Sequence, residues 1–202
     1  MVFVMFTRFT TPIAAILLSS FASISHADEN SLYSEAVPYD ASFIRFIGFE
    51  NADTAVFAGK EFHLLENEKQ AYLPISSTRL NNVEAGSYVS LIKQPDGSVE
   101  TIFEGPRNGR SKVFLFLVNA SDVPHELRLT DESAVVIANV KAQSADQRGV
   151  NPINVSLGVF KSTETEPLAV FDVALKRGQN ISFIVDDTGV QLVENRFGLV
   201  AK

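Results

Sequence analysis

Short runs of β-branched and aromatic residues, separated by turn residues, recur along most of this chain. The runs Ser42–Ile47, Tyr88–Ile92 and Val99–Phe103 mix apolar with polar positions, which is typical of strands. Between the last two lies Gln94-Pro95-Asp96-Gly97, where Pro presets the backbone angle φ and Gly accepts a positive φ. No long stretch has the 3.6-residue apolar spacing of an amphipathic helix. The sequence therefore predicts β-sheets rather than a helical body.

Seven further runs are predicted strands: Lys112–Val118, His125–Leu129, Val135–Ala138, Asn154–Phe160, Leu168–Ala174, Ile181–Val185 and Val190–Glu194. Strands at this spacing favour β-sandwiches. The segment Glu104–Ser111 has two Gly, one Pro and no apolar residue, as linkers between domains often do. We therefore predict an all-β chain of two consecutive antiparallel β-sandwich-like domains, residues 28–106 and 112–202, joined by a short Gly/Pro linker at 107–111.

The two predicted domains share a sequence pattern. The segment from Gly86 to Gly97 aligns without gaps with the segment from Gly178 to Gly189, and each reads Gly, strand, turn, Gly and a second strand. The second domain then carries an insertion around Gln143–Phe160. We hypothesise a duplicated module, against the alternative that both copies follow general β-hairpin patterns. A different strand order in the two halves would contradict the duplication.

Residues 1–27 are expected to be a cleaved secretory signal peptide. They hold one basic and no acidic residue, an apolar centre, and Ser25-His26-Ala27 as a small-residue cleavage pattern. The true start, at Met1 or Met5, stays open. The apolar centre is too short to cross roughly 30 Å of hydrocarbon, so we expect no stable membrane anchor after cleavage. An exported chain without cysteine fits a bacterial periplasm.

The charge balance and the residue types exclude several function classes. With 24 acidic against 17 basic residues and a formal net charge of −7, nucleic-acid binding through phosphate contacts is not expected. The absence of cysteine excludes thiolate nucleophiles and Cys-ligated metal sites. The carboxylate pair Asp186-Asp187 lacks the spacing of a calcium loop and is interpreted as a hairpin turn. We therefore expect no metal and no cofactor.

The sequence also lacks a recognisable catalytic constellation. Only His63 and His125 follow the predicted signal peptide, and no Gly-x-Ser-x-Gly motif is present. Both histidines lie beside strand residues and are interpreted as half-exposed strand positions. We predict that the protein is not an enzyme and has no catalytic residues.

The candidate interaction residues are cations and one amide that stand out in an acidic chain. Arg148 and Asn151 lie in the predicted polar loop Ala145–Pro152, where Pro152 favours an extended Asn151 and arginine is suited to pairing with carboxylates. The other candidates are Arg107, Arg110, Lys176 and Arg177. The alternatives remain open: a structural loop anchor for Arg148 and Asn151, and a solvated surface for the rest.

Several short motifs lie along the whole mature chain: Leu32-Tyr33, Ser42-Phe43-Ile44-Arg45, Gly86-Ser87-Tyr88, Arg148–Leu157 and Leu175–Gly178. The Arg-x-x-Asn-Pro block at Arg148–Pro152 is the most distinctive of them. In these motifs the chain resembles the AlgF family, periplasmic accessory proteins of bacterial alginate O-acetylation.

The resemblance implies a soluble periplasmic protein needed for acetyl groups to reach the mannuronate residues of exported alginate, a biofilm exopolysaccharide. Its partners would be periplasmic and membrane alginate O-acetyltransferases that carry the catalytic residues. We therefore expect a non-catalytic adaptor that docks the acetyltransferases, the polymer or both. The alternatives are a carbohydrate-binding module that contacts the mannuronate polymer directly and, less favoured, an acetyl-group carrier.

Overall fold

Strands form where the sequence concentrates Val, Ile, Leu and Phe, and turns form at its Gly, Pro and Asp residues. The computed structural model describes residues 35–50, 53–65, 68–107 and 111–201, and Ser34–Lys202 form one compact unit. The predicted signal peptide, residues 1–27, lies outside the described residues. Within the described ranges, no helix is both long enough and apolar enough to span a membrane.

The first half of this unit, residues 35–104, holds a four-stranded sheet in the order β4-β1-β5-β6 and the hairpin β2-β3. Its strands are β1 (Ala41–Ile47), β2 (Thr54–Phe57), β3 (Lys60–His63), β4 (Leu73–Ser76), β5 (Tyr88–Lys93) and β6 (Val99–Glu104). The short 3-10 helix η3 (Ser77–Arg79) follows β4. A buried core that includes Ile44, Phe46, Phe62, Ile75 and Leu91 joins the hairpin to one face of the sheet.

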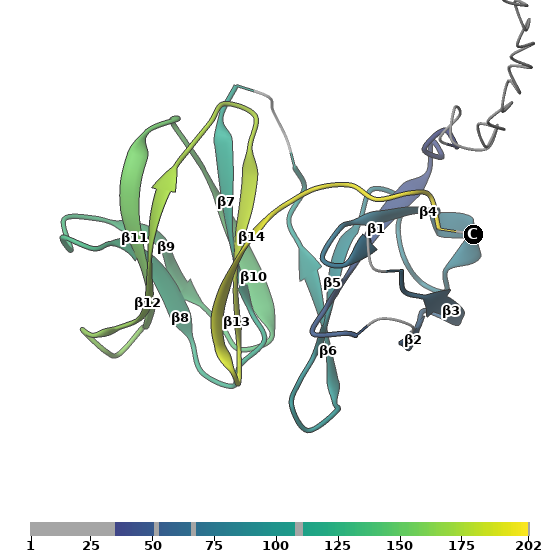
Figure 1. Ribbon diagram of the computed structural model, residues 1–202, viewed down its shortest axis with the longest axis horizontal. Coiled ribbons are helices and arrows are strands. Elements are labelled where there is room, and N and C mark those ends of the chain that lie inside the picture. The colour runs from purple at the N-terminus through teal and green to yellow at the C-terminus, as the bar shows by residue number, and fades with distance from the viewer. Residues whose placement is uncertain (1–34, 51–52, 66–67, 108–110, 202) are drawn as a thin grey trace, which may run out of the picture. The chain divides into compact units, whose positions relative to one another are not determined.

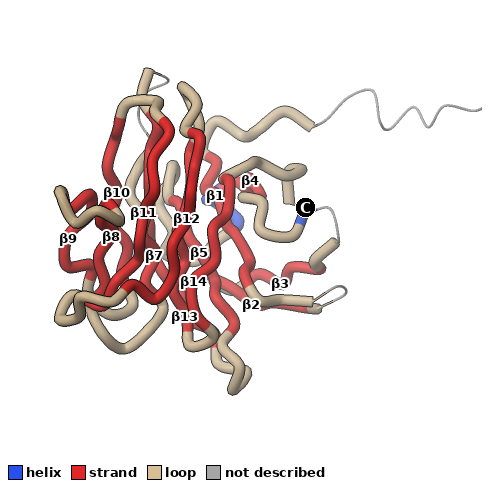
Figure 2. The backbone as a smooth tube through the Cα atoms, turned by 60° about the vertical axis from the view of Figure 1, so that its left-hand side comes forward, coloured by secondary structure: helices blue, strands red, loops and turns tan. Residues whose placement is uncertain are grey.

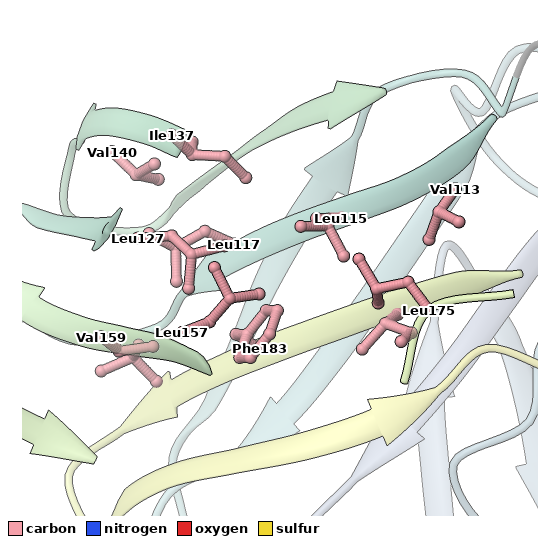
Figure 3. Close-up of a cluster of buried hydrophobic side chains, with 12 residues drawn as sticks. Val113, Leu115, Leu117, Leu127, Ile137, Val140, Leu157, Val159, Leu175 and Phe183 are labelled. Carbon is pink, nitrogen blue, oxygen red and sulfur yellow. The ribbon is translucent and has the colours of Figure 1, made fainter. Parts of the chain in front are cut away.

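The second half, residues 113–194, holds two four-stranded sheets in the orders β10-β7-β13-β14 and β12-β11-β8-β9. Its strands are β7 (Val113–Asn119), β8 (His125–Leu129), β9 (Val135–Val140), β10 (Ser144–Val150), β11 (Asn154–Lys161), β12 (Pro167–Ala174), β13 (Asn180–Asp186) and β14 (Gly189–Glu194). Leu115, Leu117, Leu127, Leu157 and Phe183 belong to the core between these sheets (Figure 3). This half is a β-sandwich.

The predicted all-β, sandwich-like fold is confirmed. The hairpin at Gln94–Gly97 connects β5 and β6, with Gly97 at a φ of +88° and its amide donating to the Gln94 carbonyl at 2.9 Å. The sequence did not indicate that the two central strands of each main sheet, β1 with β5 and β7 with β13, run parallel. Parallel pairing is possible because each connection is long and carries further strands.

One predicted loop is a strand. The segment Ala145–Pro152 was expected to be a polar loop, but most of it lies in β10, which pairs antiparallel with β7 from Ser144 to Val150. β10 is an edge strand, so its exposed positions need no apolar side chains. Its strand conformation comes from pairing with β7 rather than from local propensity.

The main sheets of the two halves have the same topology. Strands β4, β1, β5 and β6 correspond in order and direction to β10, β7, β13 and β14. The registers also agree, because Phe43 pairs with Tyr88 as Phe114 pairs with Asn180. The shared order supports the duplication hypothesis.

The turns that precede the equivalent strands β5 and β13 also match. Gly86 and Gly178 both have a φ of +81°. The Gly86 amide donates to the Ala41 carbonyl, and the Gly178 amide donates to the Lys112 carbonyl. The extra strands of the second half are β11 and β12. They overlap the insertion predicted around residues 143–160 only in β11, because β10 is the counterpart of β4.

Both faces of each main sheet are covered. Because side chains alternate along a strand, Leu115 and Leu117 of β7 enter the sandwich core while Phe116 and Val118 enter a second cluster. That cluster includes Ile47 from the first half. The two main sheets therefore pack on each other, with β2-β3 and β12-β11-β8-β9 as outer layers (Figures 1 and 2). β6 ends at Glu104 and β7 begins at Val113, on either side of the predicted linker; the domain limits themselves stay a prediction.

Candidate functional site

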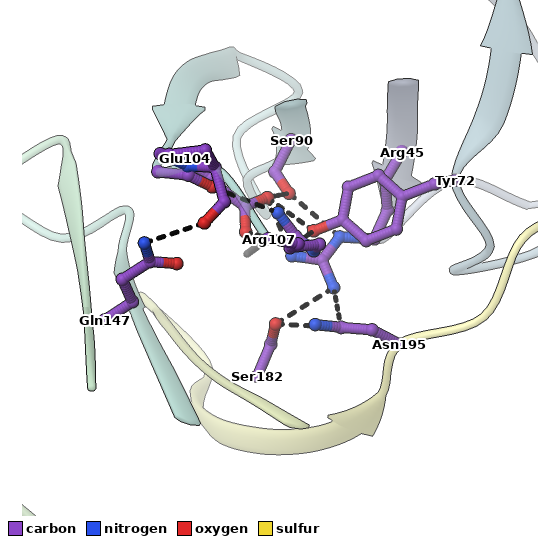
Figure 4. Close-up of polar contacts among 10 residues, drawn as sticks. Arg45, Tyr72, Ser90, Glu104, Arg107, Gln147, Ser182 and Asn195 are labelled. Atoms are coloured by element: carbon purple, nitrogen blue, oxygen red, sulfur yellow. Dashed lines mark hydrogen bonds and ion pairs between the residues drawn. The ribbon is translucent and has the colours of Figure 1, made fainter. Parts of the chain in front are cut away.

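A group of polar side chains is buried where the two main sheets meet (Figure 4). We call it the arginine centre, and its members are Arg45, Tyr72, Ser90, Glu104, Arg107, Ser182 and Asn195. Arg45 of β1 is 0% exposed. Its Nε donates to Ser90 Oγ at 2.9 Å and its Nη2 to Glu104 Oε1 at 2.9 Å. Its Nη1 donates to Asn195 Oδ1 at 2.8 Å, so the guanidinium binds both halves.

Glu104, the last residue of β6, is the anion of this centre. Burial by itself raises the pKa of the Glu104 carboxyl, but the charges of Arg45 and Arg107 and hydrogen bonds from Ser90 and Tyr72 outweigh it and hold that pKa below 4.5. Burial, together with the Glu104 charge, raises the pKa of Tyr72, whose hydroxyl donates to Glu104 Oε1 at 2.7 Å. The centre therefore holds an ionised carboxylate between two arginines.

Arg107 was predicted as a partner-binding residue, and the structure places it in the arginine centre. Its Nη2 donates to Glu104 Oε2 at 2.9 Å and also contacts the Tyr72 hydroxyl. Its guanidinium carbon lies 4.1 Å from the Tyr88 ring centroid and 4.2 Å from that of Phe116. The Arg107 side chain is almost fully buried, and its guanidinium is engaged in these cation–π contacts and in the ion pair with Glu104.

Three of the other predicted residues come together at one end of the second half. Lys176 and Arg177 are exposed in the turn between β12 and β13. The Gly178 amide of this turn donates to the Lys112 carbonyl, and Lys112 Nζ donates to Asn151 Oδ1 at 2.7 Å. We call this surface, formed by Lys112, Asn151, Lys176 and Arg177, the basic end.

Arg148 lies on the edge strand β10, where it pairs with Leu115 of β7. It is exposed, and its Nη1 donates to the Val136 carbonyl of β9 at 3.3 Å. The contact links the open edges of the two sheets of the sandwich. Arg110 lies outside the described residues.

A shallow groove of about 430 Å³ is lined by residues of β11 and β12 next to the basic end. Its lining is mostly apolar, with Val155, Val173 and Ala174 beside the polar residues Asn154, Ser156 and Asp172. Asn154 pairs with Ala174, two residues before Lys176. The Arg-x-x-Asn-Pro block and the strand after it therefore supply parts of both surfaces.

A serine–histidine contact occurs in the turn before β8. Ser121 Oγ lies 3.3 Å from His125 Nδ1 and donates to Asn119 Oδ1 at 2.9 Å. Asn119 in turn donates to the carbonyls of Val123 and Val140. His125 is 1% exposed rather than half-exposed, and burial lowers its pKa. The contact thus caps a turn beside a buried imidazole.

The other polar positions singled out in the sequence lie in a strand and a turn. His63, which was predicted to be half-exposed, is an exposed residue at the end of β3. Asp186 Oδ1 accepts the Thr188 and Gly189 amides at 2.8 and 3.2 Å, which forms the predicted hairpin turn. Within the described part of the chain, no cluster of three or more His, Cys, Asp or Glu could hold a metal ion.

Arg45 and Glu104 are the buried polar pair that sequence reasoning did not identify as a site. The signal was present, because Arg45 is the only charged residue in the run Ala41–Ile47, where the other residues are apolar except Ser42. A charge in a strand that is buried on both faces needs a buried partner. The sequence could not indicate which carboxylate, because Glu104 is 59 residues away.

The family model described as "Alginate O-acetyl transferase AlgF" matches residues 15–182. The alginate biosynthesis protein AlgF of Pseudomonas aeruginosa is 26% identical over 194 residues, 88% of each chain. That of Pseudomonas fluorescens is 25% identical over 188 residues, 87% of this chain and 84% of its own.

A solved structure of the C-terminal domain of AlgF from P. aeruginosa is 25% identical, covers 46% of this chain and 99% of its own, and has a TM-score of 0.35. The family model spans most of the sequence, from residue 15 to residue 182. On that match, the chain belongs to the AlgF family of alginate biosynthesis proteins.

Proposed function

We propose that this protein is a non-catalytic periplasmic adaptor of alginate O-acetylation, which docks periplasmic and membrane O-acetyltransferases. Membership of the AlgF family supports the process. The observation that carries the adaptor role is the basic end, where Lys112, Lys176 and Arg177 gather on a chain of net charge −7. Local charge of the opposite sign to the rest of a protein steers and orients an acidic partner surface.

Among the described residues, the polar side chains best suited to chemistry take part in structural contacts. Ser121 and His125 hold a turn. Arg45, Glu104 and Tyr72 hold the two halves together from a buried position. This use of the reactive side chains supports an adaptor that leaves bond formation to its partners.

Co-purification from periplasmic extract tests the proposal. The double reversal Lys176→Glu/Arg177→Glu is expected to lower recovery of the acetyltransferases about tenfold and to reduce polymer acetylation. The matched control is Lys141→Glu/Lys161→Glu, which reverses two lysines at the opposite end of the sandwich. In the strand registers, Lys161 of β11 lies opposite His125 of β8, and His125 lies opposite Val140 of β9, the residue before Lys141. Equal recovery with both variants would refute the role of the basic end.

The groove beside the basic end favours a second candidate, direct contact with the mannuronate polymer. Asn154, Ser156 and Asp172 could hydrogen-bond sugar hydroxyls, while the neighbouring cations would attract uronate carboxylates. In this case, mannuronate oligomers should bind saturably and more weakly as salt rises. Absence of binding at millimolar oligomer would remove this candidate.

An acetyl-group carrier is the remaining alternative. It would require a serine or threonine ester, so the intact mass after incubation with an acetyl donor would increase by one acetyl group. We expect the mass to stay unchanged.

A further inference from the structure

The two main sheets contact each other through equivalent faces. In the shared register, Ile47 of β1 corresponds to Val118 of β7, and Ile92 of β5 corresponds to Ile184 of β13. All four side chains belong to the buried cluster between the sheets, together with Ile102 of β6 and its counterpart Val193 of β14. A contact of equivalent surfaces is the arrangement of a two-fold symmetric dimer.

The segments that leave the two main sheets also cross over. After β14, the tail Arg196–Ala201 runs to the first half (Figure 1). There the Tyr72 amide donates to the Arg196 carbonyl at 2.9 Å, the Gly198 amide to the Tyr72 carbonyl at 2.9 Å, and the Ala201 amide to the Pro74 carbonyl at 2.8 Å. The tail thus lies along β4, an edge strand of the first main sheet.

The segment after β6 makes the corresponding crossing in the other direction. The Pro106 carbonyl accepts a hydrogen bond from Gln147 Nε2 of β10 at 2.8 Å. β10 is the edge strand that corresponds to β4. Each half therefore sends the segment after its last strand to the same edge of the other half, as in a strand-exchanged dimer.

The arginine centre lies among equivalent positions of this interface. Ser90 of β5 corresponds to Ser182 of β13, and both serines are completely buried. Arg45 Nε donates to Ser90 Oγ, and its Nη1 lies 3.3 Å from Ser182 Oγ. Separation of the halves would leave Arg45 without two of its acceptors and open an apolar cluster to water.

We infer that the two halves form a single rigid body, built like a strand-exchanged dimer within one chain. A linker of this composition would by itself allow the two halves to reorient independently. The buried contacts between the halves prevent that reorientation. As an adaptor, the protein would hold its binding surfaces at a fixed separation and orientation. This consequence rests on the proposed function; the rigidity does not.

The absence of cysteine from the chain allows a direct test with two spin labels in the full chain. Val56→Cys on β2 and Val170→Cys on β12 place labels on side chains that are 70% and 50% exposed, one in each half. Pulsed electron paramagnetic resonance is expected to give one narrow distance distribution. A short Gly-Ser insertion within residues 108–110 should leave it unchanged, and a broad or shifted distribution would overturn the inference.

In contrast to the linker insertion, a variant in the arginine centre is expected to change the distance distribution. Arg45→Met should remove the single narrow peak, whereas Arg128→Met, which removes an ion pair and a cation–π contact within the second half alone, should retain it. Retention of the narrow peak in Arg45→Met would contradict the role given to the centre. If Arg45→Met does not fold, the linker insertion decides alone.

The spin-label result is independent of any partner. A narrow distribution with no recovery of acetyltransferases would defeat the proposed function and leave the rigid body standing. A broad distance distribution with normal recovery of acetyltransferases would defeat the rigid body and leave the proposed function standing.

Discussion

Arg45 occupies the middle of a strand that is buried on both faces, and it is tolerated there because acceptors surround it. The carboxylate of Glu104, the hydroxyl of Ser90 and the amide oxygen of Asn195 accept from all three guanidinium nitrogens. A buried ion pair is weak support for stability in itself, but removal of one partner leaves an uncompensated charge or polar group.

Replacement of Arg45 by Met should therefore destabilise the protein. The expected loss is about 3–5 kcal/mol in the free energy of unfolding, measured by urea denaturation. The control Lys161→Met removes a pair whose side chains are 40% and 47% exposed and should cost about 1 kcal/mol or less. Equal losses in the two variants would contradict the special role of the buried centre.

His125 predicts a pH dependence of stability. Burial lowers its pKa below 6.5, with Lys161 acting in the same direction and the Val123 carbonyl and Glu164 opposing it. Below pH 6.5, His125 therefore takes up a proton in the unfolded chain but not in the folded protein. The contribution of His125 to the free energy of unfolding is complete above pH 6.5 and is lost as the pH falls toward the lowered pKa.

The measurement is urea unfolding at pH 7.5 and 5.5. The wild type should lose stability between these values, and His125→Gln should lose less. His63→Gln serves as the control because His63 is exposed. A wild-type slope that persists in His125→Gln would assign the effect to another group.

At the scale of elements, the tail Arg196–Ala201 acts as an additional edge segment of the first main sheet. Its three backbone hydrogen bonds to Tyr72 and Pro74 cover β4, and Arg79 Nη1 donates to the Ala201 carbonyl at 3.2 Å. An uncovered edge strand exposes unpaired backbone groups that can pair with other chains. The tail thus follows the second half in sequence but protects the edge of the first half.

Truncation after Asn195 should expose that edge. We expect faster hydrogen exchange at the Tyr72 amide and a greater tendency to self-associate, while amides of the outer strands β8 and β11 stay protected. Light scattering and exchange by mass spectrometry measure the two effects. Unchanged exchange in the first half would show that the tail contributes nothing to it.

At the scale of the whole molecule, the shared cluster between the sheets predicts cooperative unfolding. All tyrosines of the sequence precede residue 89 and there is no tryptophan, so tyrosine fluorescence reports the first half while circular dichroism reports both. The two probes should give coincident transitions in the wild type.

Phe116→Ala should separate these transitions, because Phe116 is buried between the halves and its loss costs about 3–5 kcal/mol. Leu127→Ala, in the core of the second half alone, should lower stability with a single transition retained. Coincident transitions in Phe116→Ala would indicate that other contacts couple the halves.

The sequence by itself determined the β class, most strand positions and the hairpin at Gln94–Gly97, because alternation and turn residues act locally. It also indicated the repeat, since Gly86 and Gly178 need the same positive φ. It could not identify β10, whose polar residues form a strand only through pairing with β7.

The roles of the cations were decided by the tertiary structure. Arg107 and Lys176 are both cations two residues from a glycine in the sequence, yet Arg107 is buried against Glu104 and Lys176 is exposed. Burial and pairing of a charge depend on contacts between residues far apart in the chain, such as Arg45 with Asn195, and local patterns carry no information about such distances.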